Sequence, residues 1–218
     1  MFLTRLDLHH FRYFDRFQLN PVPGCNFVFG PNGSGKSSLL EAIYVLAMGR
    51  SFRSAQLSPL IRHHQAEFQV IGCWKNAYER QFTVGFGRKQ SGSDIRLNGQ
   101  AISSLSELVS LVPVQLINHD SFHLLDAGPQ CRREFLDWGV FHSEARFYPA
   151  WQRYQRALKQ RNAGLKRRLP LAQLNLWEQE LSMQAEVIHS LREAYMRLFL
   201  PPFEKVLAKL LVVDNLTI

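Results

Sequence analysis

The sequence has 218 residues, a hydrophobic share of 46% and a formal net charge of +8. A chain of this length can bury a substantial core in one or two domains. No run approaches the ~18 apolar residues of a membrane span, and the N-terminus lacks the pattern of a secretion signal. Three cysteines without metal-like spacing are typical of packing residues in a reducing compartment, so we expect a cytoplasmic protein.

The first half of the chain consists largely of short alternating runs that predict β-strands. These strands are predicted at residues 3–11, 13–19, 26–29, 68–74, 80–86, 95–97 and 112–117. Residues 37–48 instead repeat apolar side chains with a helical period, and Gly49 is expected to end that helix. Asn98-Gly99 is a strong hairpin signal. Together these patterns predict an α/β lobe with an antiparallel flank.

Between the predicted strand 26–29 and the helix 37–48 lies a phosphate-loop pattern, Gly-x-x-x-x-Gly-Lys-Ser. The predicted nucleotide-binding residues are Gly30, Pro31, Asn32, Gly33, Ser34, Gly35, Lys36, Ser37 and Ser38. The glycines let backbone N–H groups point at phosphate oxygens, and the following helix adds its positive end. Lys36 supplies charge for the β- and γ-phosphates, and the Ser37 hydroxyl suits Mg²⁺. The motif therefore predicts a site for ATP and Mg²⁺.

The second half of the chain is predicted to be helical from about residue 120. Pro129, Pro149 and Pro170 each occupy a position where a helix can begin. A stripe of apolar residues from Leu171 to Leu198 predicts helix–helix packing, and the Pro201-Pro202 pair is expected to end the last long helix.

These sequence patterns predict that the chain has three segments. Residues 1–120 form a nucleotide-binding lobe, residues 121–205 a helical lobe, and residues 206–218 the start of a return strand. Leu210 to Asp214 is an apolar run that ends in an acid, which is either a Walker B strand for Mg²⁺ or an ordinary strand end. The chain stops in mid-pattern, so a truncated product or fragment is expected.

Positive charge is concentrated in one part of the chain. Residues 129–168 contain ten Lys or Arg and three acids, which leaves +7 of the total excess. A localised basic surface favours a polyanion such as DNA. Arg132 and Arg133 are the first candidates for DNA phosphates, with a role at the lobe interface as the alternative. Arg50 and Arg53 are candidates for nucleotide or DNA, with a solvated loop as the alternative.

Two further polar residues are candidates for the nucleotide site. Arg12, at the break between the first two strands, either reaches a phosphate or lies at the edge of the core. Gln115, in the strand-like run 112–117, either approaches Mg²⁺ or is an ordinary polar strand residue.

The chain resembles the N-terminal part of the RecF family of bacterial recombination-repair ATPases, which are relatives of the SMC and ABC ATPases. The segments that carry the resemblance are Phe11-Arg12, Gly30 to Ser38 with Leu40 to Tyr44, Gly49 to Arg53, Gly128-Pro129 with Arg132 to Asp137, and Leu158 to Asn162. The resemblance implies an ABC/SMC-type ATPase head with an inserted helical lobe. The chain departs from the family pattern at His119-Asp120, where many members have Pro-Glu.

The resemblance also implies a function. Two subunits close head-to-tail over ATP, bind DNA near gaps and single-strand/double-strand junctions, and act with RecO- and RecR-type mediators to load RecA and support the SOS response. The family's signature motif and Walker B acids are not found in this sequence, so the chain is not expected to hydrolyse ATP by itself. Two other functions remain open from the residues: a small P-loop kinase that uses Asp214, or a non-catalytic module that binds nucleotide.

Overall fold

The computed structural model describes residues 1–76, 78–89, 91–102 and 104–210. The chain divides into two compact units, Met1–Ile117 and a second that begins at Asn118. No helix among the described residues is long and apolar enough to cross a membrane.

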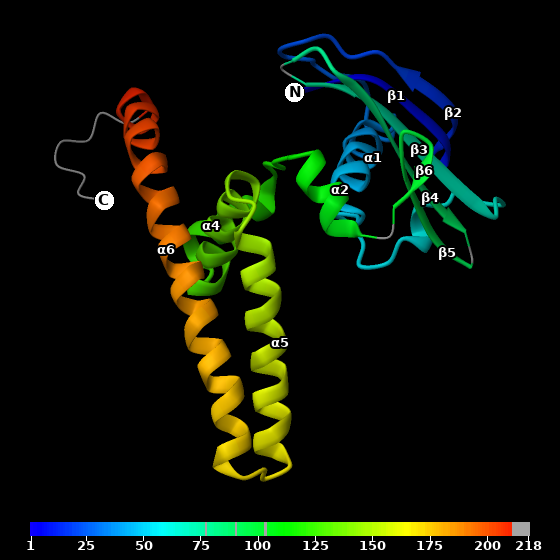
Figure 1. Ribbon diagram of the computed structural model, residues 1–218. Helices are drawn as coiled ribbons and strands as arrows, with labels where there is room; N and C mark the ends of the chain where they lie inside the picture. The colour runs from blue at the N-terminus through cyan, green and yellow to red at the C-terminus, as the bar shows by residue number, and fades with distance from the viewer. Residues whose placement is uncertain (77, 90, 103, 211–218) are drawn as a thin grey trace. The chain divides into compact units, whose positions relative to one another are not determined.

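A six-stranded antiparallel sheet forms the frame of the first unit, in the order β2-β1-β3-β4-β5-β6 (Figure 1). The strands are β1 (Phe2–Phe11), β2 (Phe14–Leu19), β3 (Glu67–Lys75), β4 (Gln81–Lys89), β5 (Gly92–Leu97) and β6 (Gln100–Ala101). Burial alternates along β1 and β3 because successive side chains point to opposite faces. Asn98 and Gly99 have φ of 50° and 83°, which confirms the predicted tight turn before β6.

Helix α1 (Lys36–Met48) packs against the apolar face of this sheet. Leu6 of β1, Val70 of β3 and Leu46 of α1 are completely buried there. The helix ends as predicted, since Gly49 has a left-handed φ of 61° and its N–H bonds the carbonyl of Val45. Helix α2 (Leu105–Leu111) and the short helix η1 (Ser58–Leu60) complete the core of the first unit.

Two predicted strands of the first unit are wrong. Residues 26–29 form no strand, and Phe27 and Phe29 are 88% and 92% exposed. Residues 112–117 are also irregular, although Val112 is buried. Both runs have the local pattern of a strand, but no described strand pairs with either of them, and a strand needs a partner for its backbone groups.

The second unit is helical. It contains η2 (His119–Phe122), α3 (His123–Asp126), α4 (Pro129–Ser143), α5 (Phe147–Lys166) and α6 (Leu171–Leu210). Helices α5 and α6 form a long hairpin (Figure 1). Val140 of α4 packs with Phe147, Ile188 and Leu191 of the hairpin to form the core of the second unit. Helix α4 begins at Pro129 as predicted.

Helix α6 departs from the sequence prediction in three ways. It continues through Pro201 and Pro202, and residues 206–210 extend it in place of a return strand. The two prolines cannot bond the carbonyls one turn back, but that turn is exposed, so solvent can satisfy those carbonyls. Leu171 and Leu198, predicted in the packing stripe, are 77% and 75% exposed. Asp214 lies outside the described residues.

Candidate nucleotide site and the Glu41 cluster

The phosphate-loop residues form a glycine-rich loop that leads directly into α1. Gly30, Gly33 and Gly35 have φ of 154°, 83° and 91°, which residues other than glycine rarely adopt. Gly35 is also close to the sheet, because a Cβ there would lie 2.8 Å from Cζ of Phe14. The strand expected before this loop is absent from the described residues, whereas the helix expected after it is present.

Positive charge and backbone donors meet at the start of α1. The Lys36 ammonium donates to the carbonyls of Gly30 and Pro31 at 2.7 and 2.8 Å, so the loop's own backbone holds the charge over the loop. No described side chain caps the N-terminus of α1, which leaves first-turn N–H groups for an anion. Ser37 is exposed at this end, and Ser38 is buried beneath it. The arrangement suits a polyphosphate.

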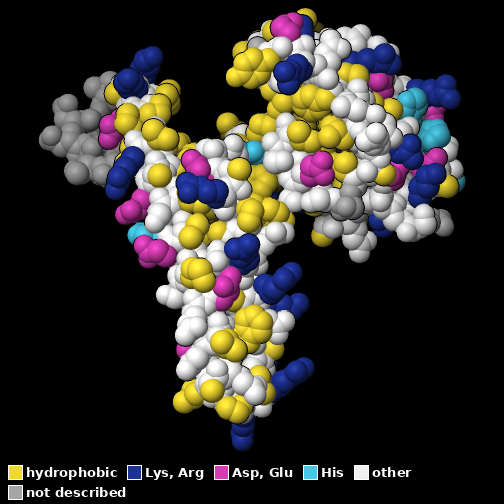
Figure 2. All heavy atoms as spheres, viewed as in Figure 1, with side chains coloured by type: hydrophobic (Ala, Val, Ile, Leu, Met, Phe, Trp, Pro, Cys, Tyr) yellow, Lys and Arg dark blue, Asp and Glu magenta, His cyan; other side chains and the backbone are white. Residues whose placement is uncertain are grey.

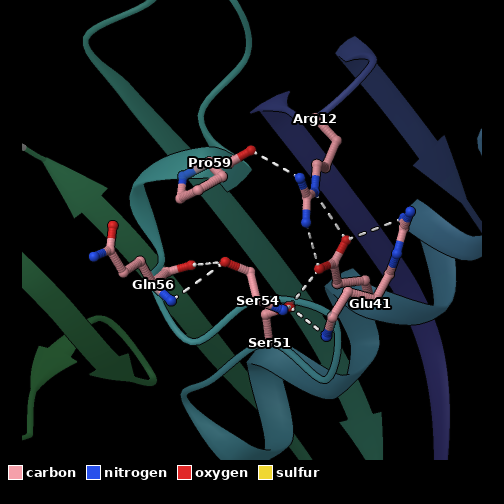
Figure 3. Close-up of polar contacts among 7 residues, drawn as sticks. Arg12, Glu41, Ser51, Ser54, Gln56 and Pro59 are labelled. Atoms are coloured by element: carbon pink, nitrogen blue, oxygen red, sulfur yellow. Dashed lines mark hydrogen bonds and ion pairs between the residues drawn. The ribbon is translucent and has the colours of Figure 1, made fainter.

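A fully buried carboxylate, Glu41, lies in the same helix five residues after Lys36 (Figure 3). Arg12, from the turn between β1 and β2, binds it at two points: Nε to Oε2 at 2.9 Å and Nη2 to Oε1 at 2.8 Å. Arg12 also donates to the carbonyl of Pro59 at 3.0 Å. The structure thus places Arg12 at the edge of the core, and contact with a phosphate stays a prediction.

The segment after α1 is attached to the same carboxylate. The Ser51 hydroxyl donates to Oε1 of Glu41 at 2.5 Å and accepts from the N–H groups of Arg53 and Ser54. Nη1 of Arg53 lies 3.8 Å from Oε2 of Glu41, and this arginine is 48% exposed. Residues 50–55 line an open hollow of about 430 Å³. Glu41 therefore ties the β1–β2 turn, α1 and this loop together, in what we call the Glu41 cluster (Arg12, Glu41, Ser51 and Arg53).

Sequence reasoning assigned no role to Glu41 or Ser51. The available signal was an acid inside the otherwise apolar run from Leu39 to Met48, because a buried acid requires a partner. The partner was not evident, since Arg12 is 29 residues away and belongs to another element.

Of the remaining predicted site residues, only Arg50 lies beside the Glu41 cluster. Gln115 is exposed on an irregular segment, where its amide donates to the carbonyl of Leu116 at 3.3 Å. Arg132 and Arg133 are exposed in the first turns of α4, in the second unit, and Arg132 donates to the carbonyl of Ala127 at 3.5 Å. Arg50 is exposed at the rim of the hollow lined by residues 50–55.

Comparison with known proteins gives concordant results. The family model described as the RecF/RecN/SMC N-terminal domain matches residues 2–196. "DNA replication and repair protein RecF" from Azotobacter vinelandii is 45% identical over the whole chain, and that from Cellvibrio japonicus is 44% identical over 99% of it. The chain spans 60% of the length of these relatives.

Solved structures agree with this relationship. "Structure of the recombination mediator protein RecF-ATPrS in RecFOR pathway" superimposes with a TM-score of 0.79 and 27% identity, and covers 90% of this chain and 54% of the other. The Smc head domain from Pyrococcus furiosus superimposes with a TM-score of 0.57, over 93% of this chain and 62% of the Smc chain. Because the identity is only 19%, this match shows the fold alone. The chain belongs to the RecF/RecN/SMC N-terminal domain family and matches the N-terminal portion of RecF.

Proposed function

We propose that this chain binds ATP at residues 30–38. The observation that carries the proposal is the Lys36 ammonium, held 2.7 and 2.8 Å from two loop carbonyls at the uncapped N-terminus of α1. Backbone N–H groups of the loop and helix would bind phosphate oxygens, and Lys36 would neutralise their charge. Ser37 would supply a hydroxyl to Mg²⁺, which keeps most of its waters. A solved relative is described as RecF-ATP, which supports this choice of nucleotide.

DNA binding is the second part of the proposal. It is supported by the concentration of Lys and Arg in residues 129–168 and by the DNA replication and repair role named for the relatives. Arg132 and Arg133 are exposed and would bind backbone phosphates. Arg50 and Arg53 would add a second basic contact in the first unit, where Glu41 and Ser51 position Arg53.

Assembly is the third part of the proposal. By family membership, the protein to which this sequence belongs would dimerise over ATP and act with RecO- and RecR-type mediators in RecA loading and the SOS response. The RecFOR pathway named for a solved relative supports this role. The family match also favours a repair factor over the kinase and the non-catalytic module.

The test of nucleotide binding is Lys36→Ala, with Lys209→Ala as a control of equal charge on α6. Titration with a fluorescent ATP analogue and Mg²⁺ is expected to show a loss of affinity of about 100-fold or more for Lys36→Ala, equivalent to one or two charge-assisted hydrogen bonds. The control should bind as the unaltered chain does, and both should keep the same circular dichroism. Unchanged affinity in Lys36→Ala would refute the nucleotide site.

A further inference from the structure

Helix α5 and the turn that follows it have an unusual charge distribution. Residues 145–177 contain eight Lys or Arg and no Asp or Glu. The neighbouring helix α6 has mixed charges and includes Glu178, Glu180, Glu186 and Glu193. Figure 2 shows basic side chains along the α5 edge of the hairpin and at its tip. The excess positive charge of the hairpin therefore belongs to α5 and the tip.

One face of α5 is used to pack against α6. Ala157 and Gly164 are buried on it, and a Cβ on Gly164 would lie 2.8 Å from Leu174 of α6. Arg161 lies toward the same side, where its Nε bonds Glu178 of α6 at 2.9 Å. The packing face thus uses one of the cations and pairs it with an acid.

Four other cations of α5 form a basic ridge: Arg153, Arg156, Lys159 and Lys166. At 100° per residue, Arg156, Lys159 and Lys166 fall within about 80° of one another and lie about 80–180° from the direction of Ala157 and Gly164. Arg153 lies only about 20–40° from that direction, at the border of the packing face. All four are exposed, and no described carboxylate lies within 4.0 Å of any of them. With a rise of 1.5 Å per residue, the basic ridge is about 20 Å long.

The intrinsic stability of the helix does not account for the basic ridge. Lys166 is in the last turn, where a cation interacts favourably with the helix dipole. Arg153, Arg156 and Lys159 are in the middle of the helix and follow one another at i, i+3, where like charges cost about 0.2–0.5 kcal/mol per pair. The described residues provide no compensating anion within 4.0 Å, so a bound external anion would relieve this repulsion.

The shape and chemistry of the ridge fit a nucleic-acid backbone. The row of cations extends about 20 Å along the helix axis, which matches about six phosphates of one strand at 3.4 Å each. Gln152, Gln155 and Asn162 are exposed along the same helix and provide neutral hydrogen-bond donors, a combination common at phosphate contacts.

We propose that the basic ridge of α5 binds the phosphodiester backbone of duplex DNA, so that the hairpin lies along the duplex. The inference rests on the proposed DNA-binding function and adds residues outside the candidates Arg132, Arg133, Arg50 and Arg53. The contact is to phosphates, so it contributes affinity and orientation without sequence preference.

The test compares two four-site variants of the full 218-residue chain. The ridge variant is Arg153→Gln, Arg156→Gln, Lys159→Gln and Lys166→Gln. The control variant is Arg16→Gln, Arg80→Gln, Lys205→Gln and Lys209→Gln, four exposed cations that also form no ion pair with any described residue. Binding to a labelled duplex of about 20 base pairs is measured by fluorescence anisotropy over a salt series. Thermal unfolding checks that both variants are folded.

The ridge variant is expected to lower the slope of log affinity against log salt by about three to four units, since each phosphate contact contributes about 0.9. Its affinity at low salt should fall by about tenfold or more, and the control should change the slope by less than about one unit. Should the ridge variant unfold, Arg153→Gln with Arg156→Gln is expected to lower the slope by about two.

Three outcomes overturn the proposal, and they are distinguishable. If the unaltered chain binds duplex DNA but the ridge and control variants behave alike, the ridge assignment is wrong and DNA binding stands. If the unaltered chain shows no salt-dependent binding, both the ridge and the DNA part of the proposed function are wrong. If the ridge variant loses binding to polyglutamate but keeps its affinity for DNA, the ridge recognises an acidic protein instead.

Discussion

Arg12 and Glu41 form a two-point ion pair across the first unit, with nitrogen–oxygen distances of 2.9 and 2.8 Å. Glu41 is fully buried, whereas the Arg12 side chain retains 22% exposure. Because α1 also carries Lys36 and Ser37, this pair fixes the phosphate-binding end of the helix relative to the β1–β2 turn. Ser51 and Arg53 extend the same connection to the loop of residues 50–55.

Glu41→Gln is expected to destabilise the chain by about 3 kcal/mol, because it leaves the Arg12 charge partly buried without a counter-charge. Urea denaturation measures the change. The matched control is Glu67→Gln, which removes an exposed pair with Lys89 and should cost less than about 1 kcal/mol. Arg12→Gln combined with Glu41→Gln should cost less than the two single changes added together. Equal effects of Glu41→Gln and Glu67→Gln would show that the cluster is not structural.

Gly35→Ala is expected to cost about 1–3 kcal/mol and to weaken ATP binding, because the residue has φ of 91° and its Cβ would overlap Phe14. Gly99→Ala provides the control. Gly99 has a similar φ of 83°, but a Cβ there would have no atom within 4 Å, so this change measures the cost of backbone strain without any overlap. Phe14→Leu in the Gly35→Ala background should restore only the packing part. A Gly35→Ala cost no larger than that of Gly99→Ala would exclude the overlap.

Arg192→Ala is expected to destabilise the helical unit by about 2 kcal/mol. Arg192 of α6 binds Asp137 of α4 at 2.7 and 2.8 Å, and both side chains are less than one-third exposed. The control is Arg197→Ala. The Arg197 side chain is 81% exposed, and its Nη2 lies 4.0 Å from Oε2 of Glu193. This change should cost less than about 0.5 kcal/mol of unfolding free energy. Thermal unfolding distinguishes them, and similar melting temperatures would contradict the prediction.

His142 is expected to make the stability of the helical unit depend on pH. Burial lowers the pKa of His142 below 6.5, and its Nε2 has no hydrogen-bond partner among the described residues. Its pKa is lower in the folded than in the unfolded chain, so the unfolded chain takes up the proton first as pH falls. Stability should therefore be greatest above pH 6.5 and decline as pH falls through 6.5 toward the lower folded pKa.

The measurement for His142 is the melting temperature from pH 8 to pH 5, compared with that of His142→Phe. The variant keeps an aromatic ring beside Trp138 and Phe141 but cannot titrate. Its melting temperature should fall less over this range than that of the unaltered chain. Parallel curves for the two proteins would rule His142 out as the source of the pH dependence.

Local patterns in the sequence were sufficient for several features. The alternation in β1 and β3, the hairpin at Asn98-Gly99, the helix that ends at Gly49 and the helix start at Pro129 all depend on residues close in the chain. The phosphate-loop motif is local for the same reason, since one short segment contains both its glycines and Lys36. Alternation, turn chemistry and helix termination act over a few residues, so the sequence alone predicts them.

Other features depended on which distant segments meet. Whether residues 26–29 become a strand depends on a neighbouring strand, which the described residues lack. The partners of Glu41 come from another turn and another loop, and the exposed side of α5 is defined only once α6 covers the opposite side. Ion pairing in a core and burial of a helix face are properties of contacts between elements, so the tertiary structure alone decided them.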